Sequence, residues 1–138
     1  MSDNHVQLAQ RLYDLFGQGD IPGVLALFDD QIEWRPAEGH PYRPSGALWV
    51  GPQVLLTELF TRIGQDWDGF AVTLASLLPT PDGVLAQGRY AGTYKATGHP
   101  IDAQFAHVLT MRDGRLRGFQ QYVDTAQVQT VMGYASGG

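Results

Sequence analysis

One histidine stands where an ionisable side chain is unusual. Over residues 101–112, alternate positions are apolar, and His107 falls in that row between Phe105 and Leu109. A buried imidazole costs free energy unless it has a hydrogen-bond partner or borders a cavity that admits water or ligand. With an ordinary pKa of about 6.5, it can take or give a proton at neutral pH. We therefore expect an acid/base role for His107, with a satisfied core histidine as the alternative.

Asp124 is the carboxylate residue considered as a partner for His107. It ends the last predicted strand, where alternation does not decide whether its side chain points inward. Asp124 either bends into the pocket, where it would serve as a general base that orients the imidazole, or caps the helix that follows, and the two roles are compatible. Neither residue suffices for catalysis alone.

Aromatic residues are expected to form the wall of a hydrophobic ligand site. A tyrosine hydroxyl in such a wall steadies a developing oxyanion. The alternative is a packed aromatic core, which we favour for Trp34. The predicted ligand-binding residues are Tyr13, Trp34, Tyr42, Tyr90, Phe105 and Tyr122.

Helices and one strand are predicted in the first half of the chain. Apolar residues at three- and four-residue spacings indicate helices, and Asn4, Asp20 and Pro52 are suited to begin them. The predicted helices span residues 4–16, 20–28 and 52–63, and the predicted strand spans residues 31–35. Residues 36–51 hold too much proline and glycine for a regular element, so we expect a loop that covers the cavity mouth with His40 and Tyr42.

The second half of the chain switches to period-two patterning. Asp113-Gly114 is a strong hairpin signal between two such segments. An antiparallel meander is therefore predicted, with a short helix after Asp124. The predicted strands span residues 70–78, 84–95, 101–112 and 115–124.

Composition excludes several classes of function. The 138 residues suit a single domain, 1–138, with a core of about 5–132, and the net charge of −5 disfavours nucleic acid. Zero cysteines exclude disulfides, cysteine-ligated metals and thiol nucleophiles, and the 4 histidines lack the spacing of a joint metal site. We expect no metal and no cofactor. No membrane-spanning run or basic leader is visible, so we expect a cytoplasmic protein.

Several segments resemble one known family. They are Leu12-Tyr13-Asp14-Leu15-Phe16 with Gly19-Asp20, Ile32-Glu33-Trp34, Gly51-Pro52, the run from Ala106 to Gly114, and Gln121-Tyr122-Val123-Asp124-Thr125. With the order of elements, they resemble the SnoaL-like, ketosteroid isomerase-related branch of the nuclear transport factor 2-like superfamily. The resemblance implies an α+β fold in which a cone-shaped, curved antiparallel sheet wraps around N-terminal helices and encloses a cavity.

The resemblance also implies roles for particular residues. SnoaL-like polyketide cyclases place a histidine on the penultimate long strand and an aspartate at the end of the last one, where His107 and Asp124 stand here. Steroid isomerases use an aspartate base near the first strand; Glu33 and Glu38 are nearby, but neither matches that base. The Arg-Asp-Asp arrangement of limonene epoxide hydrolases is not matched, because Asp102 is expected to face away from the pocket.

Three functions are compatible with this pattern. The first is a cofactor-independent enzyme, an isomerase or polyketide cyclase type, that moves protons on a small hydrophobic carbonyl compound. The second is a non-catalytic small-molecule-binding or accessory domain, and the third is a structural dimerisation domain. In all three we expect a homodimer formed through the sheet.

Overall fold

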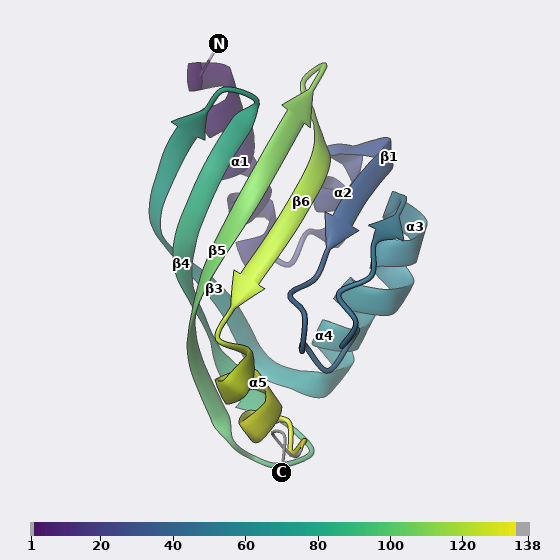
Figure 1. Cartoon of the computed structure of the whole chain (residues 1–138), viewed down its shortest axis with the longest axis vertical. Coiled ribbons are helices and arrows are strands. Elements are labelled where there is room, and N and C mark those ends of the chain that lie inside the picture. Colours follow the sequence, from purple (N-terminus) through teal and green to yellow (C-terminus); the bar gives the residue numbers. More distant parts are fainter. Residues whose placement is uncertain (1, 135–138) are drawn as a thin grey trace.

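A curved, six-stranded sheet forms one wall of the molecule, and helices lie against it (Figure 1). The computed structural model describes residues 2–134. The strand order is β2-β1-β6-β5-β4-β3. The strands are β1 Phe28–Arg35, β2 Trp49–Val50, β3 Trp67–Thr80, β4 Gly83–Tyr94, β5 Pro100–Arg112 and β6 Arg115–Val123.

Strands β3 to β6 form the predicted antiparallel meander. Strand β1 then pairs with β6 in the parallel direction, with Trp34 opposite Phe119. This strand starts at Phe28, so the prediction that the second helix extends to residue 28 is wrong. The reason is a long-range one, because Phe28 pairs with Leu116 and the Leu116 amide donates to the Leu27 carbonyl over 2.9 Å. The α+β fold with a curved sheet is confirmed.

The helices are α1 Ser2–Gly17, α2 Ile21–Ala26, α3 Pro52–Leu55, the π-helix η1 Leu56–Phe60, α4 Thr61–Asp66 and α5 Thr125–Val131. Asp20 caps α2 as predicted, accepting from the Gly23 amide over 2.9 Å. Helix α1 starts before Asn4, so Asn4 is not its cap. Among residues 2–134, no helix is both long enough and apolar enough to span a membrane.

Alternation along β5 follows the prediction. His107 is 3 % exposed, and the odd-numbered residues around it are buried while their neighbours are not. Strand β6 breaks the alternation, because Thr110 pairs with Gly118 whereas Met111 pairs with Leu116. Arg117 is therefore an extra residue in a β-bulge. Residues on either side of the bulge reverse their faces, which is why alternation on this strand did not choose one.

Aromatic rings fill the space between sheet and helices. Trp34 stacks on Phe119 with ring centroids 3.6 Å apart, and Phe60 meets Trp34 edge-on at 5.8 Å. Phe105 stacks on His107 at 4.0 Å. The imidazole is therefore packed among aromatic rings.

Candidate functional site

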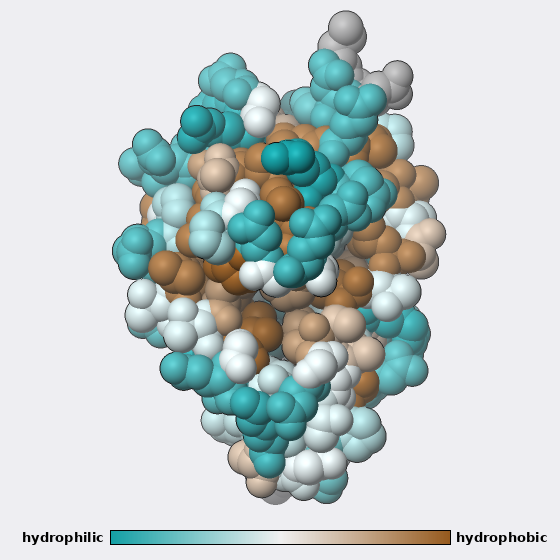
Figure 2. Space-filling view, turned by 180° about the vertical axis from the view of Figure 1, so that it is seen from behind, coloured by the Kyte–Doolittle hydropathy of each residue, from teal (hydrophilic) through white to brown (hydrophobic). Residues whose placement is uncertain are grey.

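A cavity of about 90 Å³ lies between the sheet and the helices. It has room for several water molecules, each of which needs about 10–15 Å³ measured in this way. The face of the molecule opposite to that of Figure 1 carries apolar side chains around a hollow (Figure 2). Among residues 2–134, the lining includes no aspartate or glutamate, and its polar members are Tyr13, His40, Tyr42, Tyr90, His107 and Gln121.

His107 lies between two tyrosines at the wall of this cavity. Its Nδ1 is 2.6 Å from the Tyr13 hydroxyl, and its Nε2 is hydrogen-bonded to the Tyr90 hydroxyl. Tyr13 comes from α1 and Tyr90 from β4, so the helix layer and the sheet each contribute one partner. Both ring nitrogens are thus satisfied, as burial requires.

Burial decides the charge of these groups. Desolvation lowers the pKa of His107 to about 3, so the ring is neutral at pH 7. Desolvation also raises the pKa of both tyrosines, and in Tyr90 the hydrogen bond from Gln121 acts in the opposite direction. The three side chains form an uncharged chain of hydrogen bonds inside an apolar hollow.

Acid is expected to weaken the fold through His107. Its pKa is lowered from 6.5 to about 3 in the folded state, so between these values only the unfolded chain binds the proton. The contribution to stability is complete above pH 6.5 and falls as the pH drops toward 3, by up to roughly 1.4 kcal/mol per pH unit. Urea midpoints between pH 7 and pH 5 should fall less steeply in His107→Gln than in the wild type. His99→Gln, which replaces an exposed imidazole, should keep the wild-type slope; an unchanged slope in His107→Gln contradicts the prediction.

The expected pairing of Asp124 with His107 is not formed. Asp124 caps α5, its Oδ1 accepting from the Gln127 amide over 3.2 Å and its Oδ2 lying 3.4 Å from the Gln127 side-chain nitrogen. Opposite His107 on β6 is Gln121, not Asp124. The reason is that the strand ends at Val123, where the chain turns into the helix and its cap uses the carboxylate.

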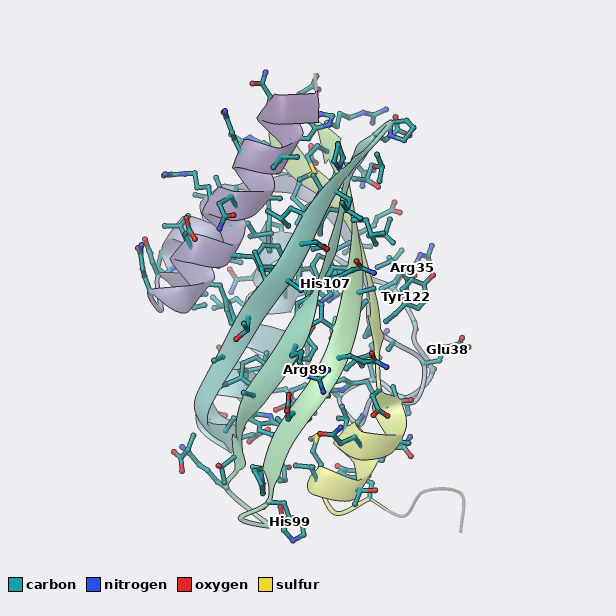
Figure 3. All side chains as sticks on the ribbon, turned by 90° about the vertical axis from the view of Figure 1, so that its left-hand side faces the viewer. Arg35, Glu38, Arg89, His99, His107 and Tyr122 are labelled. Carbon is teal, nitrogen blue, oxygen red and sulfur yellow. The ribbon has the colours of Figure 1, made fainter. Side chains whose placement is uncertain are left out.

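The structure divides the other predicted ligand residues into three groups. Tyr13, Trp34, Tyr42 and Tyr90 line the cavity. Phe105 faces inward but packs behind Tyr90 and His107, outside the lining. Tyr122 is 57 % exposed and projects on the side of the sheet away from α1, so its placement in the pocket is wrong (Figure 3). The bulge at Arg117 is the cause, because it turns Tyr122 outward.

Gln121 is the polar lining residue that the sequence did not predict. Its side-chain nitrogen donates to the Tyr90 hydroxyl over 3.1 Å, and its oxygen accepts from the Ala37 amide over 3.1 Å. A signal was present in the sequence, because apolar Leu116 and Phe119 stand three positions apart around Gly118. That spacing within a strand indicates a bulge, beyond which Gln121 faces inward.

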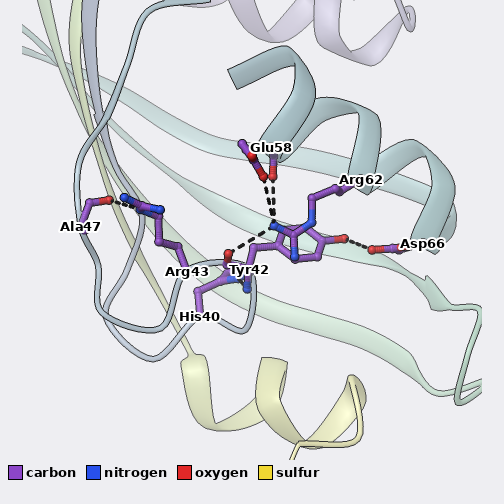
Figure 4. Close-up of polar contacts among 7 residues, drawn as sticks. All are labelled: His40, Tyr42, Arg43, Ala47, Glu58, Arg62 and Asp66. Atoms are coloured by element: carbon purple, nitrogen blue, oxygen red, sulfur yellow. Dashed lines mark hydrogen bonds and ion pairs between the residues drawn. The ribbon is translucent and has the colours of Figure 1, made fainter. Parts of the chain in front are cut away.

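A second cluster of polar contacts holds the loop of residues 36–51 in place beside the cavity (Figure 4). The Tyr42 hydroxyl donates to Asp66 over 2.7 Å, and the Arg62 guanidinium lies 4.1 Å from the Tyr42 ring centroid. His40 Nδ1 accepts from the Tyr42 amide over 3.1 Å. Burial, followed by the charge of Arg62, lowers the pKa of His40 to about 4. The loop therefore presents a neutral His40 to the cavity.

Comparison with known proteins assigns the architecture to a family. The family model described as a SnoaL-like domain matches residues 9–119. The search of curated proteins returned no match. An NTF2-like protein from Burkholderia thailandensis E264 has a similar structure, with a TM-score of 0.86, 29% identity, and coverage of 92% of this chain and 95% of that one.

Two further structures share the fold at lower identity. A putative SnoaL-like polyketide cyclase from Jannaschia sp. CCS1 has a TM-score of 0.82 and 15% identity over 98% of this chain and 95% of that one. TerC, co-crystallised with polyporic acid, has a TM-score of 0.81 and 21% identity over 94% of this chain and 98% of that one.

Proposed function

The chain belongs to the SnoaL-like domain family, and from that premise we propose that it is a cofactor-independent acid/base enzyme of the isomerase or polyketide cyclase type. Its substrate is a small, uncharged, hydrophobic carbonyl compound bound in the cavity. The observation that carries the proposal is the hydrogen-bonded chain of Tyr13, His107 and Tyr90 at the wall of an apolar hollow. TerC, a structure of the same fold, was crystallised with the small molecule polyporic acid, which supports small-molecule binding.

The chemistry assigned to the site is enolisation. Tyr13 donates a hydrogen bond to the carbonyl oxygen and passes it a proton as negative charge develops there. His107 Nδ1 is 2.6 Å from the Tyr13 oxygen and stabilises the phenolate that this transfer leaves. Because the described lining offers no carboxylate, a water molecule in the cavity takes the proton from the carbon next to the carbonyl and returns it to Tyr13. Asp124 has no part in this scheme, since it caps α5.

The test uses 2-indanone, a small ketone with exchangeable protons beside its carbonyl. In D₂O, the protein should accelerate deuterium incorporation at those carbons. Proton NMR measures the exchange as loss of the corresponding proton signals. A matched sample unfolded in urea supplies the control for exchange catalysed by buffer and by unstructured side chains. Exchange no faster than in that control, measured with bound ketone, would reject the enzymatic proposal.

Non-catalytic binding is the second candidate. Two observations favour it: the described lining has no carboxylate base, and the pKa of His107 near 3 makes the ring a weak base. This candidate expects saturable binding of 2-indanone without exchange. The same sample therefore separates the two functions, since calorimetry reports binding and NMR reports turnover.

A homodimer through the outer face of the sheet stays a prediction. Val108 on β5 is 39% exposed, and Tyr122 on β6 is 57% exposed on the same side. Soluble homo-oligomers are most often two-fold dimers. A two-fold dimer formed through this face would bury both side chains. Light scattering should report a dimer that Val108→Lys weakens, whereas Val54→Lys, on α3 with the same 39% exposure, should not. A monomeric wild type contradicts the prediction.

A further inference from the structure

The Gln121 side chain connects the loop backbone to the Tyr–His–Tyr chain. The Ala37 backbone nitrogen lies 3.1 Å from Gln121 Oε1, and Gln121 Nε2 lies 3.1 Å from the Tyr90 hydroxyl. A backbone N–H can only donate, so the Gln121 atom that faces it must be the oxygen. The amide is thereby fixed with its NH₂ toward Tyr90, and the Tyr90 oxygen accepts a hydrogen bond.

Two arrangements of protons remain along the chain. In the first, Tyr90 donates to His107 Nε2, Nδ1–H donates to the Tyr13 oxygen, and the Tyr13 hydrogen is free. In the second, Tyr13 donates to Nδ1, Nε2–H donates to the Tyr90 oxygen, and the Tyr90 hydrogen is free. The difference is where the unpaired hydroxyl hydrogen lies.

Burial distinguishes the two arrangements. Tyr90 is 8% exposed, and no further acceptor for its hydroxyl is found among the described residues. Both side chains line the cavity, but Tyr13 is half-buried whereas Tyr90 is buried, so water or a ligand in the cavity reaches the Tyr13 hydrogen more readily. A buried donor without a partner costs about 1–3 kcal/mol, which favours the first arrangement.

We propose that Gln121 is a positioning residue that holds His107 in the Nδ1–H tautomer and so turns the Tyr13 hydroxyl hydrogen into the cavity. The site then selects molecules that offer an acceptor oxygen, such as a carbonyl, over hydrocarbons of the same shape. The tautomer assignment stands without any reaction. The selectivity for an acceptor oxygen deepens the proposed function and rests on its binding of a carbonyl compound in the cavity, not on turnover.

The tautomer is read directly by NMR of protein labelled with ¹⁵N-histidine. A protonated ring nitrogen and an unprotonated one have well-separated chemical shifts, and the hydrogen bonds of the ring decide which nitrogen carries the proton. The His107 signals are assigned by their loss in His107→Gln. At pH 7 we expect protonated Nδ1 and unprotonated Nε2. A protonated Nε2 in the wild type overturns the proposal.

Gln121→Met tests whether Gln121 sets this state. Methionine has a similar length, removes the donor to Tyr90 and offers its sulfur as a weak acceptor for the Tyr90 hydrogen, so the Nε2–H tautomer should become populated. The control is Gln120→Met, because Gln120 donates instead to the backbone carbonyl of Gln121 over 2.9 Å. The Gln120→Met variant should keep the wild-type tautomer of His107. If Gln121→Met folds and its His107 stays in the Nδ1–H form, Gln121 does not set the tautomer. If this variant does not fold, the wild-type spectrum still shows which tautomer His107 adopts.

Ligand selectivity tests where the Tyr13 hydrogen points. The wild type should bind 2-indanone about tenfold more tightly than indane, its hydrocarbon counterpart, which corresponds to about 1.4 kcal/mol. Calorimetry should show this preference reduced severalfold in Gln121→Met. If the wild type binds 2-indanone and indane equally tightly, the proposal that the Tyr13 hydrogen points into the cavity is wrong. Binding preference without deuterium exchange rejects the enzymatic function and leaves the present inference standing, so the two failures are distinguishable.

Discussion

Replacing Tyr13 with phenylalanine is expected to slow deuterium exchange on bound 2-indanone by roughly 10²–10³-fold, the usual loss when one donor to a developing oxyanion is removed. The hydroxyl is the only part of the side chain that changes. The ring stays parallel to His107, at 5.9 Å between centroids and an interplanar angle of 9°, so packing in the cavity is retained. We expect kcat to fall far more than KM rises, because the lost interaction strengthens in the transition state.

The matched control removes a hydroxyl outside the cavity. Tyr94 lies on β4, packs edge-on against Trp67 at 5.0 Å and is absent from the cavity lining. Tyr94→Phe should therefore keep the wild-type exchange rate. If Tyr13→Phe exchanges as fast as Tyr94→Phe, the Tyr13 hydroxyl is not the proton donor and the enolisation scheme is wrong.

Substituting alanine for Gly88 should destabilise the fold by about 3 kcal/mol, at the upper end for an overpacked core. Gly88 lies on β4, where an added Cβ would stand 2.9 Å from Phe105 Cζ, 3.1 Å from Leu74 Cα and closer still to the Thr73 carbonyl oxygen. Two of these neighbours are backbone atoms of β3, so relief requires the strands to separate. Because Phe105 stacks on His107 at 4.0 Å, the displaced ring should also disturb the site.

Gly64→Ala is the matched substitution, and it is expected to stabilise the fold where Gly88→Ala destabilises it. Gly64 lies inside α4, and an added Cβ would meet no atom within 4 Å. Alanine lowers the entropy of the unfolded chain and favours the helix, so stability should rise by about 0.4–1 kcal/mol. Urea unfolding of both variants measures the contrast. A Gly88→Ala protein as stable as Gly64→Ala would show that β3 and β4 do not pack as closely as described.

Patterns that are local in the sequence predicted the fold well. Period-two alternation along β5 placed His107 inside, and hairpin residues at Asp113-Gly114 placed the turn before β6. Both features depend on neighbouring residues, whose preferences are readable from the chain itself. The family resemblance predicted the rest of the architecture, an α+β fold with a curved sheet around N-terminal helices. The family match and the similar structures confirm this fold.

The candidate site was less predictable because its contacts are distant in the sequence. Tyr13 and His107 are separated by 94 residues, and no pattern in either segment indicates their hydrogen bond. One extra residue at Arg117 reverses the face of every later position on β6, which exchanged Tyr122 for Gln121 at the cavity. Asp124 was expected in the pocket from family likeness, whereas the end of the strand directs it to the helix.

The parallel pair of β1 and β6 has a consequence for biosynthesis. Trp34 pairs with Phe119, so the first strand to leave the ribosome finds its main neighbour only after nearly all of the chain has been made. Until then its edge stays available to other unpaired strands, a condition that invites aggregation. Such distant pairing raises contact order and slows folding. The cavity between sheet and helices is therefore among the last features to assemble in a newly synthesised molecule.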